Sequence, residues 1–305
     1  MRHIKTLPPA FSQEPAGSHE LAGDDASPPH INDFAGDEDG IRLGSYQDCH
    51  YLASGVTAEV YRSGDRALKV IVEMRNIEPH NPFREAKILS ELKKPCIPLL
   101  ETFRDQEQRF TLVFPYMPLT LATLLERGSL TGAQLCNIFT DVFNALSHIH
   151  SQGIIHRDIK PSAFLLASPH GPVYLSDFGT AWHPRLSVST EPANAKILDI
   201  GTGPYRAPEV LFGNKAYDSA VDMWGAGVML ADIFKTMGSP TRETWPEAVN
   251  FKTPPFEIYQ VFERKEWAEI LPDVDPEWRE LVSALVRYDS ARATAEKALE
   301  FPCLK

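Results

Sequence analysis

The residues with the clearest chemical potential lie between positions 154 and 179. The run at 154–163 reads Ile-Ile-His-Arg-Asp-Ile-Lys-Pro-Ser-Ala, and Asp177-Phe178-Gly179 begins nineteen residues after Asp158. Two carboxylates and a lysine in such an arrangement supply most parts of a phosphoryl-transfer site, which needs one carboxylate for a hydroxyl proton and another for a divalent cation. Position 163 is alanine. A methyl group cannot ligate a metal, so the side chain at position 163 offers no metal ligand.

Two elements upstream of this run would position a lysine and a glutamate. Apolar and β-branched residues on both sides of Ser63-Gly64-Asp65 predict a hairpin within 51–72, with Lys69 inside its second strand. Pro82 and the spacing of apolar residues predict an amphipathic helix over 82–92 that carries Glu85. Taken alone, such a lysine is more often a solvent-facing side chain, so its meaning depends on the wider pattern.

The remaining elements connect and support these segments. A strand over 110–114 is followed by Pro115-Tyr116-Met117-Pro118, a turn-rich stretch suited to joining two lobes. An apolar stripe at helical spacing runs through 132–151 and ends before Gly153, just ahead of His156. Further helices are predicted after residue 255, from apolar residues in 256–262 and 281–286. These stripes pack into the core in any fold.

In chain order, the chemically notable residues are Lys69, Glu85, His156-Arg157-Asp158, Asp177-Phe178-Gly179 and Ala207-Pro208-Glu209. This ordered series resembles the eukaryotic protein kinases over residues 46–304. The resemblance implies an α+β fold of two lobes. A small β-rich lobe with one long helix would span 46–116, a larger, mainly α-helical lobe 117–304, and ATP would bind between them. It also implies an ATP-dependent transferase that phosphorylates proteins and uses ATP with Mg²⁺.

The resemblance also assigns catalytic roles residue by residue. Asp158 is expected to act as the base that receives the substrate hydroxyl, and Lys160 to contact the transferring phosphoryl group. Asp177 is expected to hold magnesium. Thr202 matches the threonine that hydrogen-bonds the catalytic aspartate and lysine in this family.

The nucleotide is expected to lie against the smaller lobe. Lys69 would contact the ATP phosphates and Glu85 would hold that lysine in place. Residues 115–118 would form a hinge in which Met117 keeps a backbone N–H for adenine, whereas Pro115 has none. The expected ATP-binding residues are Ala53, Gly55, Val60, Ala67, Lys69, Phe114, Tyr116, Met117 and Leu165.

Residues of the expected larger lobe indicate which group of protein kinases the chain resembles. Lys160 and Gly201-Thr202 are similar to serine/threonine kinases, and Asp289 with Arg292 looks like the cyclin-dependent kinase branch. That branch implies an ion pair between Glu209 and Arg292 and a structural role for Asp222 behind the catalytic loop.

The segment 79–85 keeps only the first proline and the Arg-Glu end of the motif that contacts cyclin in that branch. A monomer that does not require cyclin is therefore expected. With Gly201-Thr202-Gly203-Pro204-Tyr205, the chain is similar to the fungal monomeric kinases that phosphorylate cyclin-dependent kinases on their activation loops. A protein substrate of that kind, and a role in the cell cycle, follow as expectations.

Two departures from the family pattern affect ATP. The glycine-rich loop aligns with 53–60 and keeps only Gly55, which is expected to loosen the phosphate cover. Ala163 replaces the asparagine that holds a second magnesium. A slow but active kinase and a pseudokinase that acts as a nucleotide-sensing or scaffolding module both remain open. In the activation segment, residues 180–205, the position of the activating phosphate falls at Ile197, which has no hydroxyl, so no activating phosphorylation is expected there.

Composition narrows the classes of partner. The 305 residues carry a formal net charge of −11, which disfavours a broad nucleic-acid surface. The longest apolar run is too short to span a membrane, and no basic-then-apolar signal opens the chain, so an intracellular protein of the nucleus or cytoplasm is expected.

Residues 1–45 are rich in proline and acidic residues and predict a flexible acidic tail. The four cysteines are scattered and suggest neither a zinc cluster nor a disulfide framework.

Overall fold

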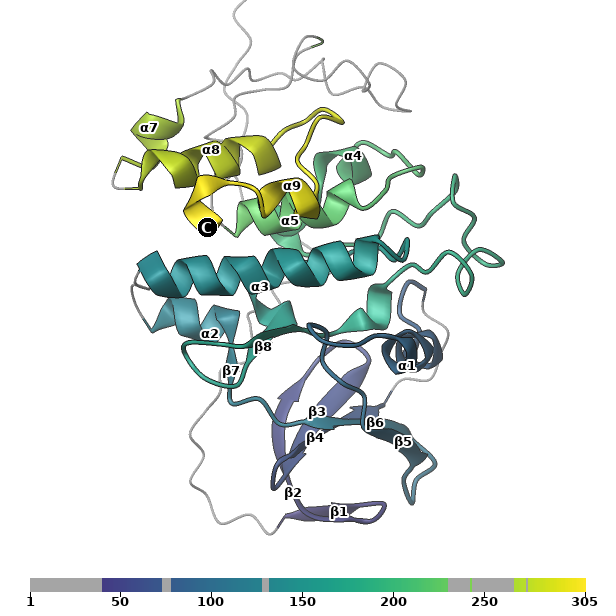
Figure 1. Ribbon diagram of the computed structural model, residues 1–305. Coiled ribbons are helices and arrows are strands. Elements are labelled where there is room, and N and C mark those ends of the chain that lie inside the picture. Colours follow the sequence, from purple (N-terminus) through teal and green to yellow (C-terminus); the bar gives the residue numbers. More distant parts are fainter. Residues whose placement is uncertain (1–39, 73–77, 128–131, 230–241, 243–265, 273) are drawn as a thin grey trace, which may run out of the picture. The chain divides into compact units, whose positions relative to one another are not determined.

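The computed structural model describes residues 40–72, 78–127, 132–229, 242, 266–272 and 274–305. The first described part is a six-stranded antiparallel sheet with strand order β1-β2-β3-β4-β6-β5 (Figure 1). Its strands are β1 (Ile41–Leu43), β2 (Tyr46–Ser54), β3 (Ala58–Ser63), β4 (Arg66–Ile71), β5 (Glu101–Arg104) and β6 (Phe110–Pro115). The hairpin predicted around Ser63-Gly64-Asp65 is confirmed as β3 and β4.

The helix predicted over 82–92 is α1 (Pro82–Glu91). Asn81 caps it, because its Oδ1 accepts a hydrogen bond of 2.9 Å from the backbone N–H of Arg84. Pro82 occupies the first turn, where its missing N–H costs nothing. The helix buries Ile88 and Leu89 in the core together with the polar Glu85. The inward face of α1 therefore brings a carboxylate into the interior beside the sheet.

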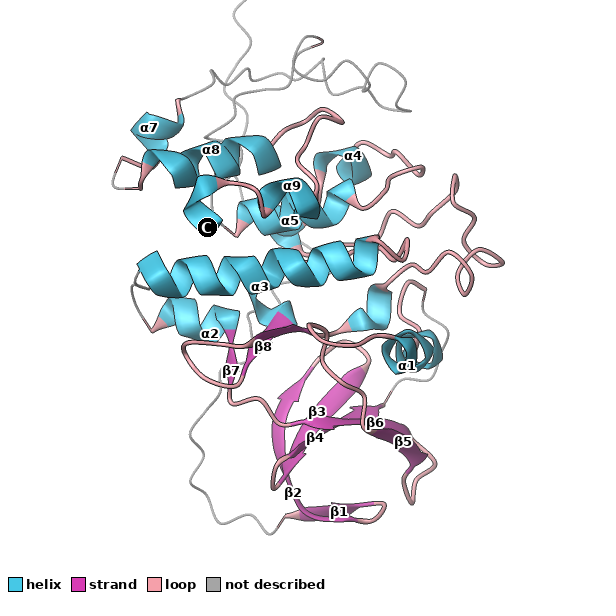
Figure 2. Ribbon diagram, viewed as in Figure 1, coloured by secondary structure: helices cyan, strands magenta, loops and turns pink. Residues whose placement is uncertain are grey.

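The second described part is mainly helical (Figure 2). Its central helix is α3 (Gly132–His150), whose apolar stripe from Ile138 to Ile149 is fully buried, as the spacing predicted. The other helices are α2 (Leu121–Glu126), α4 (Pro208–Leu211), α5 (Ala220–Val228), α7 (Trp267–Ile270), α8 (Pro276–Leu285) and α9 (Ala295–Ala298). This arrangement of a β-rich and a helical part confirms the α+β bilobal fold.

Short elements between the helices carry the loops of interest. A small sheet of order β7-β8-β9 contains β7 (Leu119–Thr120), β8 (Phe164–Leu166) and β9 (Val173–Leu175). The 3₁₀ helices are η1 (Pro161–Ala163), η2 (Phe178–Thr180), η3 (Gly203–Tyr205) and η5 (Pro302–Leu304). Thus β8 and β9 lie between the His156 loop and Asp177, and their pairing brings these two segments together.

Helix α5 approaches the catalytic loop so closely that only glycine fits at position 225. A Cβ atom there would lie 2.6 Å from the carbonyl oxygen of Ile159. Since such a contact is far shorter than any van der Waals separation, a larger residue would push α5 away from the loop. Asp222, one turn earlier on the same helix, is thereby held beside the loop backbone.

A strand lies within the segment for which the sequence predicted a flexible tail. The expected tail over 1–45 is wrong at its end, because β1 pairs with β2 and Leu43 is fully buried with Cys49, Leu68, Val70 and Val113. A three-residue strand is too short to show a periodicity, and the turn depends on Gly44, whose φ is +58°. Residues 1–39 and 243–265, including the helix expected at 256–262, lie outside the described residues.

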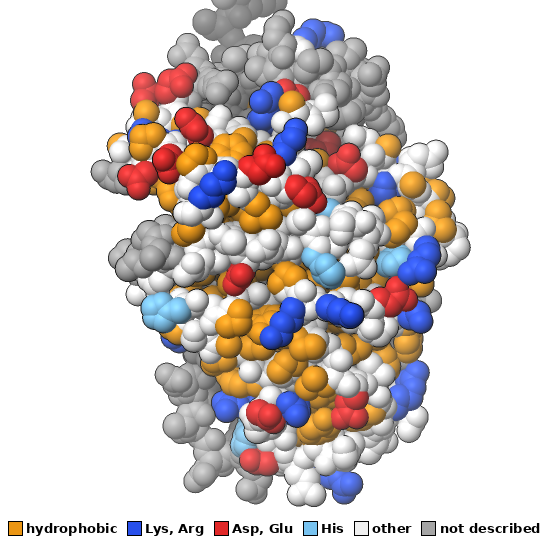
Figure 3. Space-filling view, in the orientation of Figure 1, with side chains coloured by type: hydrophobic (Ala, Val, Ile, Leu, Met, Phe, Trp, Pro, Cys, Tyr) orange, Lys and Arg blue, Asp and Glu red, His pale blue; other side chains and the backbone are white. Residues whose placement is uncertain are grey.

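Charged side chains of both signs are interspersed over the described surface in Figure 3, and acidic ones gather over α7, α8 and α9. The exposed glutamates of these helices and their ends include Glu269, Glu277, Glu280, Glu296 and Glu300. No helix among the described residues is both long enough and apolar enough to cross a membrane.

Candidate active site

Lys69, Glu85 and Asp177 converge from three different elements. Lys69 Nζ lies 2.8 Å from Glu85 Oε1, 3.0 Å from Glu85 Oε2 and 2.8 Å from Asp177 Oδ1. The lysine comes from the middle of β4, the glutamate from the buried face of α1, and the aspartate from the residue before η2. The side chain of Glu85 is 2% exposed and that of Asp177 is 55% exposed. The cluster thus has a closed side at Glu85 and an open side at Asp177.

The charges of this cluster stabilise one another. The ammonium of Lys69 holds the pKa of the Asp177 carboxyl well below its usual range. Burial alone would lower the pKa of Lys69, but the carboxylates of Asp177 and Glu85 outweigh it and raise that pKa above its usual value. Burial raises the pKa of Glu85, and the nearby Lys69 opposes this effect. A cation held by two carboxylates, with one of them exposed, is suited to bind a polyphosphate beside a metal.

A second cluster forms around Asp158. Thr202 Oγ1 donates a hydrogen bond of 2.7 Å to Asp158 Oδ1, and Lys160 Nζ lies 2.9 Å from both Asp158 Oδ2 and Thr202 Oγ1. Thr202 comes from the segment just before η3, forty-two residues after Lys160. The predicted catalytic aspartate, lysine and threonine are therefore in mutual contact.

The backbone of this loop is held by Asp222. Its Oδ2 accepts from the backbone N–H of His156 at 2.8 Å, and its Oδ1 accepts from the backbone N–H of Arg157 at 2.8 Å. His150 Nε2 lies 2.9 Å from the same Oδ2. Burial favours a higher pKa for Asp222, yet these hydrogen bonds prevail and lower it. The expected brace behind the catalytic loop is present.

Two residues near the site, Arg157 and Asp177, have positive φ angles. Arg157 has a φ of +72° and Asp177 a φ of +60°, a region that residues with a Cβ atom rarely adopt. His156 Nε2 lies 2.8 Å from the carbonyl oxygen of Ser176, which ties the loop to the residue before Asp177. Such strained conformations persist where surrounding contacts fix them, and they often mark functional sites.

The expected nucleotide residues lie on adjacent strands. Cross-strand pairs join Ala53 with Val60, Val60 with Lys69, and Ala67 with Phe114. Leu165 lies on β8 opposite Tyr174. The neighbouring strands β2, β3, β4 and β6 thus carry most of the expected set, whereas Leu165 belongs to the helical part.

The hinge and the glycine loop have specific backbone contacts. The N–H of Tyr116 donates to the carbonyl oxygen of Asp65 at 2.8 Å, and the Arg62 guanidinium lies 4.2 Å from the centroid of the Tyr116 ring. No partner within the described residues takes the N–H of Met117. Gly55 N–H donates to the carbonyl oxygen of Ala58 at 2.8 Å, which closes the loop tip into a turn. Met117 therefore keeps the free donor that the sequence suggested.

The residues present fit one magnesium ion better than two. Ala163 is buried, and its carbonyl oxygen accepts two hydrogen bonds of 2.8 Å, from the N–H and the hydroxyl of Ser176. No group of three or more His, Cys, Asp or Glu side chains suited to a metal occurs among the described residues. Because magnesium is commonly held by one or two carboxylates together with substrate phosphates, the exposed carboxylate of Asp177 suffices for one ion.

Two buried ion pairs of arginine lie among the described residues of the larger lobe. Arg292 Nη1 and Nη2 donate to Glu209 Oε1 and Oε2 at 3.0 and 3.2 Å, the pair that the sequence suggested. Arg157 pairs with Glu191, a contact that sequence reasoning missed. Nothing in the chain around Glu191 distinguishes it from a surface glutamate, and only the folded path of the activation segment brings it to the arginine.

Comparisons with known proteins agree with this geometry. The family model described as "Protein kinase domain" matches residues 46–304. The chain is 32% identical over 292 residues to the serine/threonine-protein kinase csk1 of Schizosaccharomyces pombe, a match that covers 84% of this chain and 93% of that protein. The crystal structure of the yeast RNA Pol II CTD kinase CTDK-1 complex contains a chain with a TM-score of 0.70 and 23% identity, covering 86% of this chain and 94% of that one. At that identity the likeness concerns the fold alone.

The order of the motifs, the convergence of their side chains and the match over residues 46–304 lead to one conclusion. The chain belongs to the protein kinase family and is an ATP-dependent serine/threonine-protein kinase.

Proposed function

We propose that this kinase transfers the γ-phosphoryl group of ATP to a serine or threonine hydroxyl in the activation segment of a cyclin-dependent kinase. The observation that carries the catalytic part is the convergence of Lys69 on both Glu85 and Asp177, each at 2.8 Å. The resemblance of the segments 79–85 and 201–205 to fungal monomeric kinases supports the choice of substrate. Both segments border the site, at α1 and at η3.

Each step of the transfer has a residue suited to it. Asp158 accepts the proton of the substrate hydroxyl while that oxygen bonds to the γ-phosphorus and the bond from γ-phosphorus to the bridging oxygen of ADP breaks. Lys160, beside Asp158, places a positive charge where the phosphoryl group passes. Thr202 fixes the orientation of the Asp158 carboxylate through its hydrogen bond of 2.7 Å.

The donor nucleotide would be bound mainly by the smaller lobe. Lys69 contacts the phosphates and Glu85 keeps the lysine in its rotamer. Magnesium, bound through Asp177, would offset negative charge on the phosphate oxygens. Met117 supplies its free backbone N–H to adenine, and Ala53, Gly55, Val60, Ala67, Phe114, Tyr116 and Leu165 would line the nucleotide.

Activity without cyclin is part of the proposal. The N–H of Asn81, the residue that caps α1, donates to the carbonyl oxygen of Gly179 at 3.0 Å, and Arg185 Nη2 lies 2.8 Å from Glu91 Oε2 at the other end of the helix. These contacts within the chain support an α1 position that keeps Glu85 beside Lys69 without a partner. We further propose that the protein acts as a monomer in the nucleus or cytoplasm.

The alternative of a pseudokinase rests on Ala163 and on the loss of glycines around Gly55, and the comparisons give it no support. The deciding experiment incubates the purified full chain with radiolabelled ATP and candidate cyclin-dependent kinases, first with magnesium and then with manganese. Asp158→Asn serves as the inactive control. Transfer by the wild-type chain supports the proposal. If the wild-type chain transfers nothing and Ala163→Asn restores transfer, the chain is not an enzyme in its natural form.

A further inference from the structure

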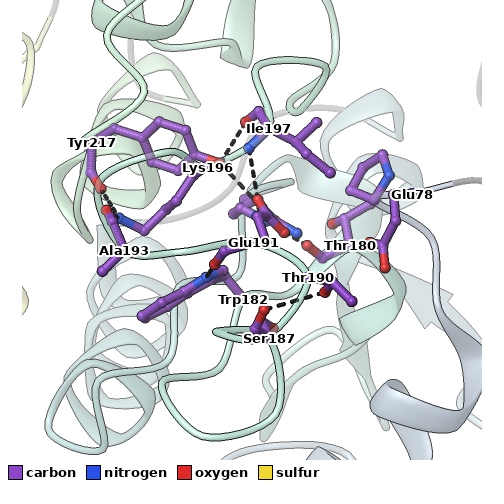
Figure 4. A network of polar contacts seen from close by, with 12 residues as sticks. Glu78, Thr180, Trp182, Ser187, Thr190, Glu191, Ala193, Lys196, Ile197 and Tyr217 are labelled. Atoms are coloured by element: carbon purple, nitrogen blue, oxygen red, sulfur yellow. Dashed lines mark hydrogen bonds and ion pairs between the residues drawn. The ribbon is translucent and has the colours of Figure 1, made fainter.

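The activation segment holds a buried carboxylate that contacts the catalytic loop. Glu191 Oε1 pairs with Arg157 Nη1, and the side chains of the two residues are 1% and 0% exposed. The backbone carbonyl of Glu191 accepts a hydrogen bond of 2.9 Å from the indole N–H of Trp182. Figure 4 shows Glu191 between Trp182 and Ile197, within the network. Arg157 Nη2 and Glu191 Oε2 have no hydrogen-bond partner among the described residues, so the pair is held through Nη1 and Oε1. Removing either charge would leave the other buried without a counter-ion, which is strongly destabilising.

The same carboxylate also contacts Ile197, the residue that aligns with the activating phosphorylation site of cyclin-dependent kinases. The backbone N–H of Ile197 donates to Glu191 Oε1 at 2.8 Å. The carbonyl oxygen of Ile197 accepts a hydrogen bond of 2.7 Å from the hydroxyl of Tyr217, and that hydroxyl accepts one of 3.1 Å from Arg157. The Glu191 side chain thus lies where the segment around position 197 meets Arg157.

Arg157 connects Glu191 to the catalytic loop. Its Nε donates to the carbonyl oxygen of Thr180 at 2.5 Å, and the hydroxyl of Thr180 donates to the carbonyl oxygen of His156 at 3.2 Å. The next residue after Arg157 is Asp158, whose carboxylate is oriented by Thr202. The path of contacts therefore joins both ends of the activation segment to the catalytic loop.

Kinase activation segments are commonly ordered by a phosphate that pairs with arginine. We propose that the carboxylate of Glu191 takes the place of such a phosphate by pairing with Arg157. The activation segment of this kinase would then adopt its catalytically competent conformation without phosphorylation. This inference rests on the proposed kinase activity and explains how its activation segment is kept ordered. It names Glu191 as a positioning residue, because its carboxylate contacts Arg157 and the N–H of Ile197 and acts on Asp158 only through Arg157.

The charge balance of the network supports this role. Lys196 is also buried, and it contacts the carbonyl oxygens of Ala193 and Tyr217 and the rings of Trp182 and Tyr217. With Glu191 neutral, the guanidinium of Arg157 would lose the one carboxylate that pairs with it among the described residues. An uncompensated buried cation is strongly unfavourable, so the segment would open to water.

The hydroxyls near Glu191 do not offer the same contact. Ser187 is fully buried, and its hydroxyl accepts a hydrogen bond of 3.0 Å from the N–H of His183, so a kinase reaches it only after the segment opens. Ser189 and Thr190 are exposed. A phosphate on either of them would not replace the buried carboxylate, because the position beside Arg157 is already filled.

The test compares four full-length proteins after phosphatase treatment, with mass spectrometry used to verify that they carry no phosphate. Glu191→Gln keeps the size of the side chain and removes its charge, and Glu191→Asp keeps the charge on a shorter stem. Asp105→Asn is the matched control, because Asp105 is also a buried carboxylate paired with an arginine, Arg109, in the turn between β5 and β6. The measurements are kcat, KM for ATP, and hydrogen exchange of the amides in 180–200.

The expected results separate positioning from simple loss of stability. The unphosphorylated wild type keeps its full kcat. Glu191→Gln lowers kcat by about tenfold or more, because the competent arrangement is populated less, while KM for ATP changes little. Glu191→Asp recovers part of the kcat, and Asp105→Asn leaves kcat near that of the wild type. Hydrogen exchange in 180–200 rises most in the Glu191→Gln protein, less in Glu191→Asp, and not in Asp105→Asn.

Two results would overturn the inference without refuting the proposed function. One is an unchanged kcat and unchanged hydrogen exchange in Glu191→Gln. The other is a wild-type kcat that collapses after phosphatase treatment. A wild type that transfers no phosphate would instead refute the proposed function, and the exchange measurement would still decide whether Glu191 orders the segment, because it needs no catalysis.

Discussion

Replacing Asp222 by asparagine tests how the catalytic loop is held in place. The side chain is buried and accepts three hydrogen bonds, two from the backbone N–H groups of His156 and Arg157 and one from His150. An asparagine has only one acceptor oxygen. If that oxygen replaces Oδ2, its amide NH₂ faces the N–H of Arg157, and in the other orientation it faces the N–H of His156.

The magnitude follows from these contacts. Each hydrogen bond to a charged group contributes about 1.5–3 kcal/mol, and a buried donor left without an acceptor costs about 1–3 kcal/mol. Losing the charge and one backbone acceptor therefore lowers the free energy of unfolding by roughly 2–4 kcal/mol. For a domain of this size we expect a decrease in Tm of roughly 5–15 °C. Because Asp158 directly follows Arg157, kcat falls as well, by about tenfold for each 1.4 kcal/mol lost in the transition state.

The assay measures Tm by calorimetry and kcat by phosphate transfer, and it includes Asp218→Asn as a control. Asp218 is exposed, and its carboxylate accepts a hydrogen bond of 2.8 Å from the N–H of Ala220 at the start of the same helix. That variant should lose less than about 1 kcal/mol, as expected for an exposed cap. Equal Tm and kcat values in the two variants would refute the proposed brace.

Three further predictions concern other parts of the molecule. Ala163→Asn should raise kcat with magnesium by about tenfold or more, because it returns an oxygen ligand, and an unchanged kcat would show that one ion is enough. Arg292→Lys should lower the free energy of unfolding by about 1–3 kcal/mol in denaturant titrations, since lysine cannot form the two-pronged contact with Glu209, and a variant as stable as wild type would argue against this contact's importance. Lys69 lowers the pKa of Asp177 in the folded state, so this carboxylate stabilises the fold fully above its unfolded pKa of about 3.9, and Tm should fall as the pH drops below about 4. A smaller acid-side fall in a Lys69→Met protein would agree with that assignment, and an identical fall would contradict it.

The elements that carry the site were predictable because their signals are local. Pro82 and the apolar spacing after it define α1, and the apolar stripe within 132–151 defines α3. The convergence of Lys69 with Glu85 followed from the order of motifs in a known family, and the structure brings these two side chains together. Local periodicity and a family pattern thus sufficed for the fold and for the central cluster.

Features that depend on long-range contacts escaped prediction. The strand β1 is three residues long, and its pairing with β2 and the burial of Leu43 against other strands stabilise it. Glu191 lies thirty-four residues from Arg157 in the chain, in a segment without periodicity. The contacts of Tyr116, whose N–H donates to Asp65 and whose ring packs against the Arg62 guanidinium, also join distant segments. Such contacts arise only when distant segments pack together, so a single sequence carries no local signal for them.

The most direct test of the account is a single-turnover measurement of phosphate transfer by the natural chain. The purified wild-type protein, with Ala163 in place and no added cyclin, is mixed with magnesium, radiolabelled ATP and an unphosphorylated cyclin-dependent kinase. We predict label on a serine or threonine of the substrate's activation segment, and none with Asp158→Asn. Absence of label from the wild-type protein with either magnesium or manganese, while ATP still binds, would contradict the central claim that this site transfers phosphate.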